Sequence, residues 1–186
     1  HKFSKEDIGL VITVDCGISS VEEVAYAKSL GLDVIVTDHH EPPVKLPAAI
    51  ALINPLIAEC AFPYKALSGV GMAFYLIAEL RKGLREKGFF KEDKEPELVE
   101  YLDLVAVGTI ADIVPLTGIN RILVRAGLKQ INLNPRLGIK TLLEVCGIPP
   151  GAAAAAEDRC PGQGGGPAGQ RQEARSGPGA GHGADQ

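Results

Sequence analysis

The order of apolar and polar positions in the first part of the chain predicts alternating strands and helices. Two runs rich in β-branched residues, Leu10–Asp15 and Asp33–Thr37, are typical of strands buried on both faces. The segment between them carries apolar residues at roughly helical spacing after the capping residue Ser20. Such a strand–helix–strand unit is right-handed in almost every known case, so we expect the two strands to be parallel. A third parallel strand is predicted over Ala49–Ile53.

The middle of the chain has the period of amphipathic helices. Its apolar residues recur every three or four positions, and glycine or proline separates the periodic segments. The segment Gly108–Asp112 is predicted to interrupt the helical pattern. The expected helices are Met72–Lys87, Glu97–Val107, Arg121–Ile131 and Gly138–Cys146. Residues 1–150 are therefore predicted to form an α/β domain, a parallel sheet with flanking helices.

The last segment, 151–186, has a different character. It is dominated by Gly, Ala and Pro, and it has no aromatic residue and no period. Such a composition buries too little apolar surface to offset chain entropy, so we predict a disordered tail. The change is abrupt, and a frameshift near Pro150 is the alternative to a natural flexible tail.

Composition narrows the class of protein. The chain has 186 residues, of which 46 % are hydrophobic. Its net charge of −4 argues against a generally basic nucleic-acid binder but allows a local basic patch. The four cysteines, at 16, 60, 146 and 160, form no Cys-x-x-Cys pair, so we interpret them as reduced thiols of a cytoplasmic protein. No apolar run is long enough to span a membrane.

Polar side chains follow two strands of the predicted unit. Asp15 ends the first strand, and Asp38, His39 and His40 follow the second, so all of them are expected at the carboxyl edge of a parallel sheet, where such sheets bind ligands. Carboxylate oxygens and an imidazole nitrogen, with no thiolate pair nearby, favour Mn²⁺ or Mg²⁺. Neighbouring side chains in extended backbone point apart, so we expect one histidine to bind metal and the other to meet substrate.

Each of these residues also has an ordinary interpretation when it is taken alone. An Asp at a strand end is commonly a turn former, and adjacent histidines in a loop are often surface residues. Asp112 could simply begin a turn before Val114-Pro115, and Arg121 could form a local salt bridge. The expected coincidence of Asp15 and His39 at one sheet edge is what favours a site.

Three motifs in this order resemble the DHH phosphoesterases. Asp15-Cys16-Gly17, Asp38-His39-His40 and Gly108-Thr109-Ile110-Ala111-Asp112 are similar to the second, third and fourth motifs of that family. The flanking segments Ile53-Asn54-Pro55, Leu67–Gly71 and Val114-Pro115-Leu116 resemble one branch, the RecJ single-stranded-DNA-specific exonucleases. The resemblance covers roughly residues 8–148.

The resemblance implies a two-metal phosphodiesterase that acts in DNA repair and recombination. It would remove nucleotides from the 5′ end of single-stranded DNA, with a single-strand-binding protein or a helicase delivering the substrate and with no role for a membrane. By the same resemblance Asp15 would bridge two Mn²⁺ or Mg²⁺ ions, and His39 and Asp112 would each ligate one.

The resemblance also assigns roles around the metals. His40 would face the scissile phosphate, and Asp38 would orient the histidines, as a carboxylate behind a ligating imidazole usually does. Arg121 is a weaker candidate for a phosphate contact.

The sequence departs from the family pattern in one respect. The first motif of the family, an Asp-x-Asp on a preceding strand, is absent, and Asp15, His39 and Asp112 are too few for two metals that each take about six ligands. We therefore expect a partial catalytic domain with little activity by itself. The alternatives are hydrolysis of a small phosphate ester, such as a short oligonucleotide, a cyclic dinucleotide or pyrophosphate, and a non-catalytic replication scaffold.

Overall fold

The computed structural model describes residues 2–91, 94–149 and 151–152. The tail predicted over 151–186 lies, apart from its first two residues, outside the described residues. None of the helices in the described ranges is both long enough and apolar enough to cross a membrane.

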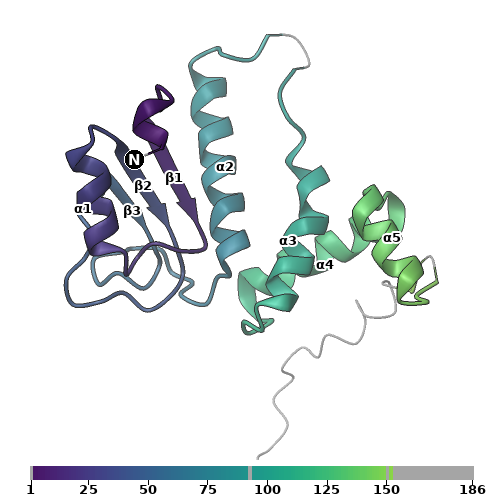
Figure 1. Cartoon of the computed structure of the whole chain (residues 1–186). Coiled ribbons are helices and arrows are strands. Elements are labelled where there is room, and N and C mark those ends of the chain that lie inside the picture. Colours follow the sequence, from purple (N-terminus) through teal and green to yellow (C-terminus); the bar gives the residue numbers. More distant parts are fainter. Residues whose placement is uncertain (1, 92–93, 150, 153–186) are drawn as a thin grey trace, which may run out of the picture.

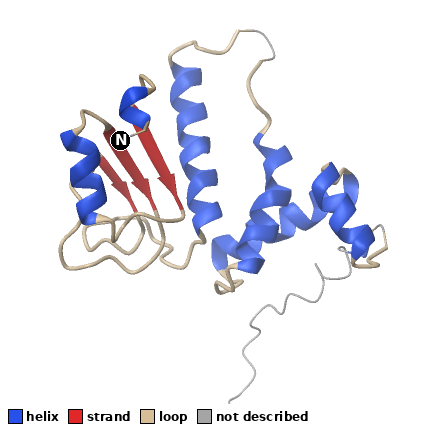
Figure 2. Cartoon of the chain, viewed as in Figure 1, coloured by secondary structure: helices blue, strands red, loops and turns tan. Residues whose placement is uncertain are grey.

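A parallel three-stranded sheet forms the first half of the fold, as the sequence predicted. Its strands are β1 (Leu10–Val14), β2 (Asp33–Thr37) and β3 (Ala51–Ile53), in the order β1-β2-β3. Helix α1 (Val21–Ser29) packs Val24 against Val34 and Val36 of the central strand. Figure 1 shows α1 on one side of the sheet and α2 (Gly69–Glu86) on the other. The three strands end at one edge, near the first turn of α2 (Figure 2).

Burial on both faces, which the apolar run 10–15 predicted, is wrong for β1. Its alternate residues Leu10, Ile12 and Val14 are 45–49 % exposed, while the residues between them are partly buried. Within the described sheet β1 is an edge strand, and the exposed residues lie on the face opposite to Val34 and Val36. The central strand β2 is the one that is covered on both sides.

The second half of the fold is helical. Helix α2 begins at Gly69, earlier than predicted, because Ser68 caps it: the Ser68 hydroxyl accepts the Gly71 N–H at 3.2 Å. Short 3₁₀ turns precede β1 and α3. The remaining elements are η1 (Phe3–Lys5), η2 (Leu98–Tyr101), α3 (Leu102–Ala111), α4 (Gly118–Leu133) and α5 (Leu137–Val145).

The predicted interruption at Gly108 does not occur, because α3 continues through it to Ala111. A Cβ at Gly108 would lie 2.8 Å from Cγ1 of Val70, so the missing side chain lets α2 approach α3 closely. The helix ends at Ala111, Asp112 is its C-cap, and Ile113 follows with a φ of 58°. Gly108 therefore serves packing rather than termination.

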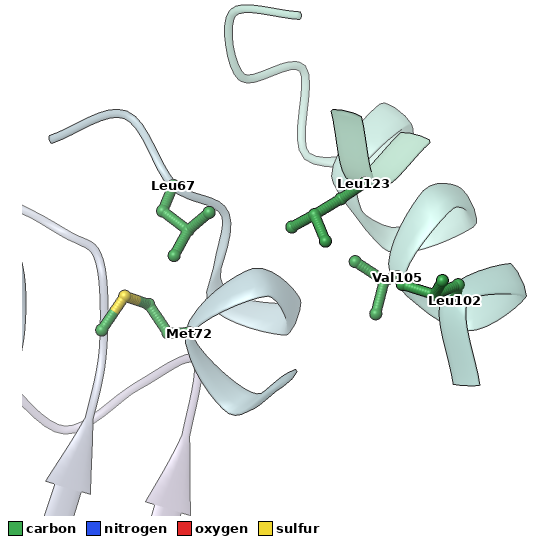
Figure 3. Packing of buried hydrophobic residues seen from close by; sticks show 5 residues of the cluster. All are labelled: Leu67, Met72, Leu102, Val105 and Leu123. Atoms are coloured by element: carbon green, nitrogen blue, oxygen red, sulfur yellow. The ribbon is translucent and has the colours of Figure 1, made fainter. Parts of the chain in front are cut away.

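The core of the helical half joins α2, α3 and α4 near the sheet edge. Figure 3 shows Leu67, just before α2, and Met72 of α2 on one side, with the labelled residues of α3 and α4 on the other, and the Met72 side chain extends toward the strands. Helices α3 and α4 approach so closely that a Cβ at Gly127 would lie 2.0 Å from the Leu102 carbonyl oxygen. The buried cluster consists of Leu67, Met72, Leu102, Val105 and Leu123. This packing fixes where the carboxyl end of α3 lies relative to the first turn of α2.

Candidate metal centre

Asp15 leaves β1 in an unusual backbone conformation. Its φ of 62° lies in the left-handed region, and its N–H donates to the Thr37 carbonyl oxygen at 3.0 Å. Its carboxylate lies against the first residue of α2, because a Cβ built on Gly69 would be 1.9 Å from Asp15 Oδ1. Only a glycine fits there, so the helix start and the carboxylate form one packed unit.

His39 lies between two carboxylates that come from distant parts of the chain. Its Nε2 is 3.1 Å from Oδ1 of Asp15 and 3.4 Å from Oδ2 of Asp112. The imidazole is only 11 % exposed, whereas the side chains of Asp15 and Asp112 are 53 % and 31 % exposed. His39 therefore contacts both of the other residues that the sequence selected as metal ligands.

The Nε2 atom of His39 is buried and has no hydrogen-bond partner of suitable geometry among the described residues. A buried polar atom without a partner costs free energy, and such atoms are rare in native structures. A divalent cation between this nitrogen and the flanking carboxylate oxygens would satisfy it. The ligand atoms of Asp15, His39 and His40 lie within 4.8 Å of one another, and the Asp112 carboxylate adds an oxygen 3.4 Å from His39 Nε2. Carboxylate oxygens and imidazole nitrogens of this kind fit Mn²⁺ or Mg²⁺.

Asp38 is buried and organises the loop that follows β2. Its Oδ2 accepts the Ile18 N–H at 2.9 Å, and its Oδ1 accepts the N–H groups of His39 at 2.8 Å and His40 at 3.2 Å. The same Oδ1 is 2.6 Å from Nδ1 of the His40 ring. Asp38 thus contacts the backbone of both histidines but the ring of His40 alone, which makes it a positioning residue.

The pKa values of this pair follow from these contacts. Burial by itself raises the pKa of Asp38, but the hydrogen bonds from the Ile18 N–H, the His40 ring and the two histidine N–H groups outweigh it and lower the pKa below its ordinary value. The hydrogen bond to Asp38 raises the pKa of His40, against partial desolvation and with help from the charges of Asp38, Asp15 and Asp112. Asp38 is therefore ionised and accepts the proton of His40 Nδ1.

The expectation that the rings of His39 and His40 diverge is wrong. Their centroids are 4.5 Å apart with an interplanar angle of 55°. The prediction assumed extended backbone, but β2 ends at Thr37, and the Asp38 carboxylate draws both following N–H groups toward itself. The histidines nevertheless differ in exposure, since the His40 side chain is 60 % exposed.

Two residues that support this centre have no predicted role in it, although both lie in segments that resemble RecJ. Asn54 donates from Nδ2 to the His40 carbonyl oxygen at 2.8 Å and accepts the Leu56 N–H at 2.8 Å. Gly69 leaves space for the Asp15 carboxylate. The sequence offered one signal for each residue. Asn54-Pro55 directly follows the predicted third strand, and Ser68-Gly69 shortly precedes the predicted helix Met72–Lys87; both dipeptides are typical of turns.

Arg121 is the sequence-predicted site residue that the structure does not bring into the cluster. It is exposed in the first turn of α4, and its guanidinium makes no ion pair within residues 2–91 and 94–149. Its neighbour Asn120 is buried and donates to the Ala66 carbonyl oxygen at 2.6 Å, which docks this turn beside the segment leading to Gly69. Among the described residues, Arg121 makes no hydrogen bond or ion pair with Asp15, His39 or Asp112.

Comparisons with known proteins identify relatives of this chain. The family model described as "DHH family, N-terminal domain" matches residues 3–109. Single-stranded-DNA-specific exonuclease RecJ of Salmonella typhimurium is 54 % identical over 151 residues, which are 80 % of this chain and 26 % of the relative. RecJ of Escherichia coli is 55 % identical over 139 residues, 73 % of this chain and 24 % of the relative. The chain thus spans about a quarter of the length of these curated relatives.

Solved structures agree with the sequence matches. A crystal structure of exonuclease RecJ bound to manganese has a TM-score of 0.65 and 35 % identity, and the match covers 83 % of this chain and 38 % of that one. RecJ of Thermus thermophilus in complex with Mn²⁺ gives a TM-score of 0.64 and 36 % identity over 83 % of this chain and 22 % of the other. The resemblance and the parallel α/β fold predicted from the sequence are confirmed. Because the family model matches more than half of its residues, the chain belongs to the DHH family.

Proposed function

We propose that this chain is the metal-binding part of a 5′-to-3′ single-stranded-DNA exonuclease of the RecJ type, which hydrolyses phosphodiester bonds in DNA repair and recombination. The observation that carries the proposal is the buried Nε2 of His39 between the carboxylates of Asp15 and Asp112. The similarity to RecJ exonucleases, two of which were crystallised with manganese, supports the choice of substrate and ion.

Asp15, His39 and Asp112 would hold Mn²⁺ or Mg²⁺. Such ions activate a water molecule and stabilise the leaving oxygen of an in-line displacement at phosphorus. These three side chains supply fewer ligands than two such ions take, so water, phosphate oxygens or further carboxylates have to complete the site. We therefore expect the chain alone to bind metal more weakly and to turn over more slowly than its longer relatives.

His40 would bind the scissile phosphate. Its Nδ1 is engaged by Asp38, which leaves Nε2 as the ring nitrogen available to a substrate oxygen. Because the pKa of His40 is raised, the imidazole holds its second proton to higher pH and can donate it to a phosphate oxygen as a charge-assisted hydrogen bond. Arg121, in the first turn of α4, would contact a phosphate further along the strand.

The partners and the compartment belong to the same proposal. A single-strand-binding protein or a helicase would expose the strand that the site degrades. The free thiols of Cys16, Cys60 and Cys146 support a cytoplasmic location, where disulfides are rare. Cys160 lies outside the described residues.

The proposal is tested by metal binding and by nucleotide release from the same protein. Calorimetry should show Mn²⁺ binding by the parent chain that is lost in Asp15→Ala and Asp112→Ala. Asp33→Ala is the matched control, because Asp33 begins β2 at the opposite edge of the sheet. With manganese, a 5′-labelled single strand should release labelled nucleotides, and its blunt duplex should not.

Two results would overturn the proposal. Equal Mn²⁺ affinity of the parent and Asp15→Ala would exclude the proposed metal centre and favour a non-catalytic replication scaffold. Hydrolysis of a cyclic dinucleotide or pyrophosphate, without release from the single strand, would favour the small-molecule phosphoesterase instead.

A further inference from the structure

A buried hydroxyl pair joins the two helix ends that carry the centre. The Oγ of Ser68 and the Oγ1 of Thr109 are 2.9 Å apart, although the residues are 41 positions apart in sequence. Both residues are completely buried. Ser68 is the N-cap of α2, and Thr109 lies in the last turn of α3. Two residues of the central apolar cluster are close in sequence: Leu67 precedes Ser68, and Val105 lies about one helical turn before Thr109.

Each of the two residues lies close in sequence to the support of one carboxylate of the centre. Gly69, which follows Ser68, touches Asp15 so closely that it has no room for a Cβ. Thr109 precedes Asp112 by less than one helical turn. The hydrogen bond therefore ties the support of Asp15 directly to the support of Asp112, on the two sides of His39 Nε2.

Apolar packing also joins the two helices. Val70 already fits against Gly108, and the apolar cluster fills the space between α2, α3 and α4. Burying two hydroxyls carries a desolvation cost that two apolar groups of the same shape would avoid. A hydrogen bond has a narrow range of length and angle, however, so it fixes the relative position of two elements better than an apolar contact.

We propose that the Ser68–Thr109 hydrogen bond is a positioning device that sets the separation of Asp15 and Asp112 and thereby the affinity of the centre for its divalent ion. The inference rests on the proposed function, because it takes Asp15 and Asp112 to be metal ligands. Ser68 and Thr109 act through these carboxylates and touch neither ion nor substrate.

The test separates metal affinity from stability with four variants of the chain. Thr109→Val removes the hydroxyl at nearly constant volume, and Mn²⁺ affinity measured by calorimetry should fall about tenfold, as is typical for groups behind metal ligands. Thr109→Ser keeps the hydroxyl and should bind Mn²⁺ within about twofold of the parent. Ser68→Ala should weaken binding at least as much as Thr109→Val, because it also removes the cap on the Gly71 N–H. The double variant should bind no more weakly than Ser68→Ala, since Thr109 then has no further bond to lose.

Val124→Ala is the control for destabilisation alone. Val124 is buried in the separate cluster of α4 and α5, so its truncation should lower the melting temperature and leave Mn²⁺ affinity unchanged. Parent-like Mn²⁺ affinity in both Thr109→Val and Ser68→Ala would overturn the inference alone, since the hydroxyls would then be merely structural. Absence of Mn²⁺ binding by the parent would overturn the proposed function and the inference with it.

Discussion

Gly69→Ala places a methyl group where the Asp15 carboxylate now lies. The added Cβ would be 1.9 Å from Oδ1, 2.3 Å from Cγ and 2.7 Å from Cβ of Asp15. Ordinary van der Waals contact begins near 3.4 Å, so the carboxylate or the helix start has to move by about 1.5 Å. The backbone of Asp15 has little freedom to do so, because it holds a left-handed φ and donates to Thr37.

Rotation of the Asp15 side chain can relieve the contacts with Oδ1 and Cγ but not the one with its Cβ, so the start of α2 has to shift as well. We expect the carboxylate to move away from His39. Oδ1 of Asp15 lies 3.1 Å from Nε2 of His39, so a displacement of about 1.5 Å removes this carboxylate as a metal ligand. We expect Mn²⁺ affinity to fall by a factor on the order of 10–100. Nucleotide release should fall about 100-fold, since a misplacement of about 1 Å has that effect on catalysis. Overpacking should cost about 1–3 kcal/mol of stability.

Gly83→Ala is the matched control in the same helix. A Cβ at Gly83 meets nothing within 4 Å, so this variant should gain about 0.5–1 kcal/mol of stability and keep the Mn²⁺ affinity of the parent. Calorimetric titration with Mn²⁺ and thermal melting of both variants provide the comparison. If Gly69→Ala bound Mn²⁺ like Gly83→Ala, the packing of Asp15 against the start of α2 would play no part in metal binding.

Three further predictions concern the residues around the ligands. Asp38→Asn places an amide N–H₂ where Oδ2 now accepts the Ile18 N–H, so the free energy of unfolding should fall by about 1–3 kcal/mol in thermal melting. Stability equal to that of the parent would contradict this prediction. In the metal-free protein, NMR titration should give His40 a pKa above its ordinary 6.5, and a value at or below 6.5 would refute this. The stabilisation that the folded protein gains from the contact of His40 with Asp38 is complete below pH 6.5 and is lost as the pH rises through the raised pKa. Arg121→Gln should reduce the slope of log affinity for single-stranded DNA against log salt by about 0.7, whereas Lys28→Gln in α1 should not, and equal slopes would exclude a phosphate contact.

The parallel strands and the edge at which they end could be predicted because the signals are local. Runs of β-branched residues around a helical segment give a strand–helix–strand unit, and its handedness is fixed by strand twist and chain connectivity. Asp15 and His39 follow the two strands directly, so their proximity came from the order of elements alone. The approach of Asp112 had no such local signal, since it depends on how α3 packs on α2, and in the sequence it was supported only by the family resemblance.

The errors arose where tertiary contacts outweigh local preference. Gly108 reads as a helix breaker, yet it lies inside α3 because Val70 needs the space of its missing side chain. The divergence of His39 and His40 assumed a strand that had already ended, and the Asp38 carboxylate curls the backbone so that the rings become neighbours.

By itself the sequence determined the parallel α/β class, the positions of the strand ends and the residue types that a divalent ion prefers, because these depend on periodicity and side-chain chemistry within short segments. Only the tertiary structure decided that the Asp15 carboxylate packs against Gly69 and that the hydroxyls of Ser68 and Thr109 form a hydrogen bond. Contacts between residues 41 or more positions apart depend on how closely two elements approach, and that distance is set by side-chain volumes summed over the whole interface.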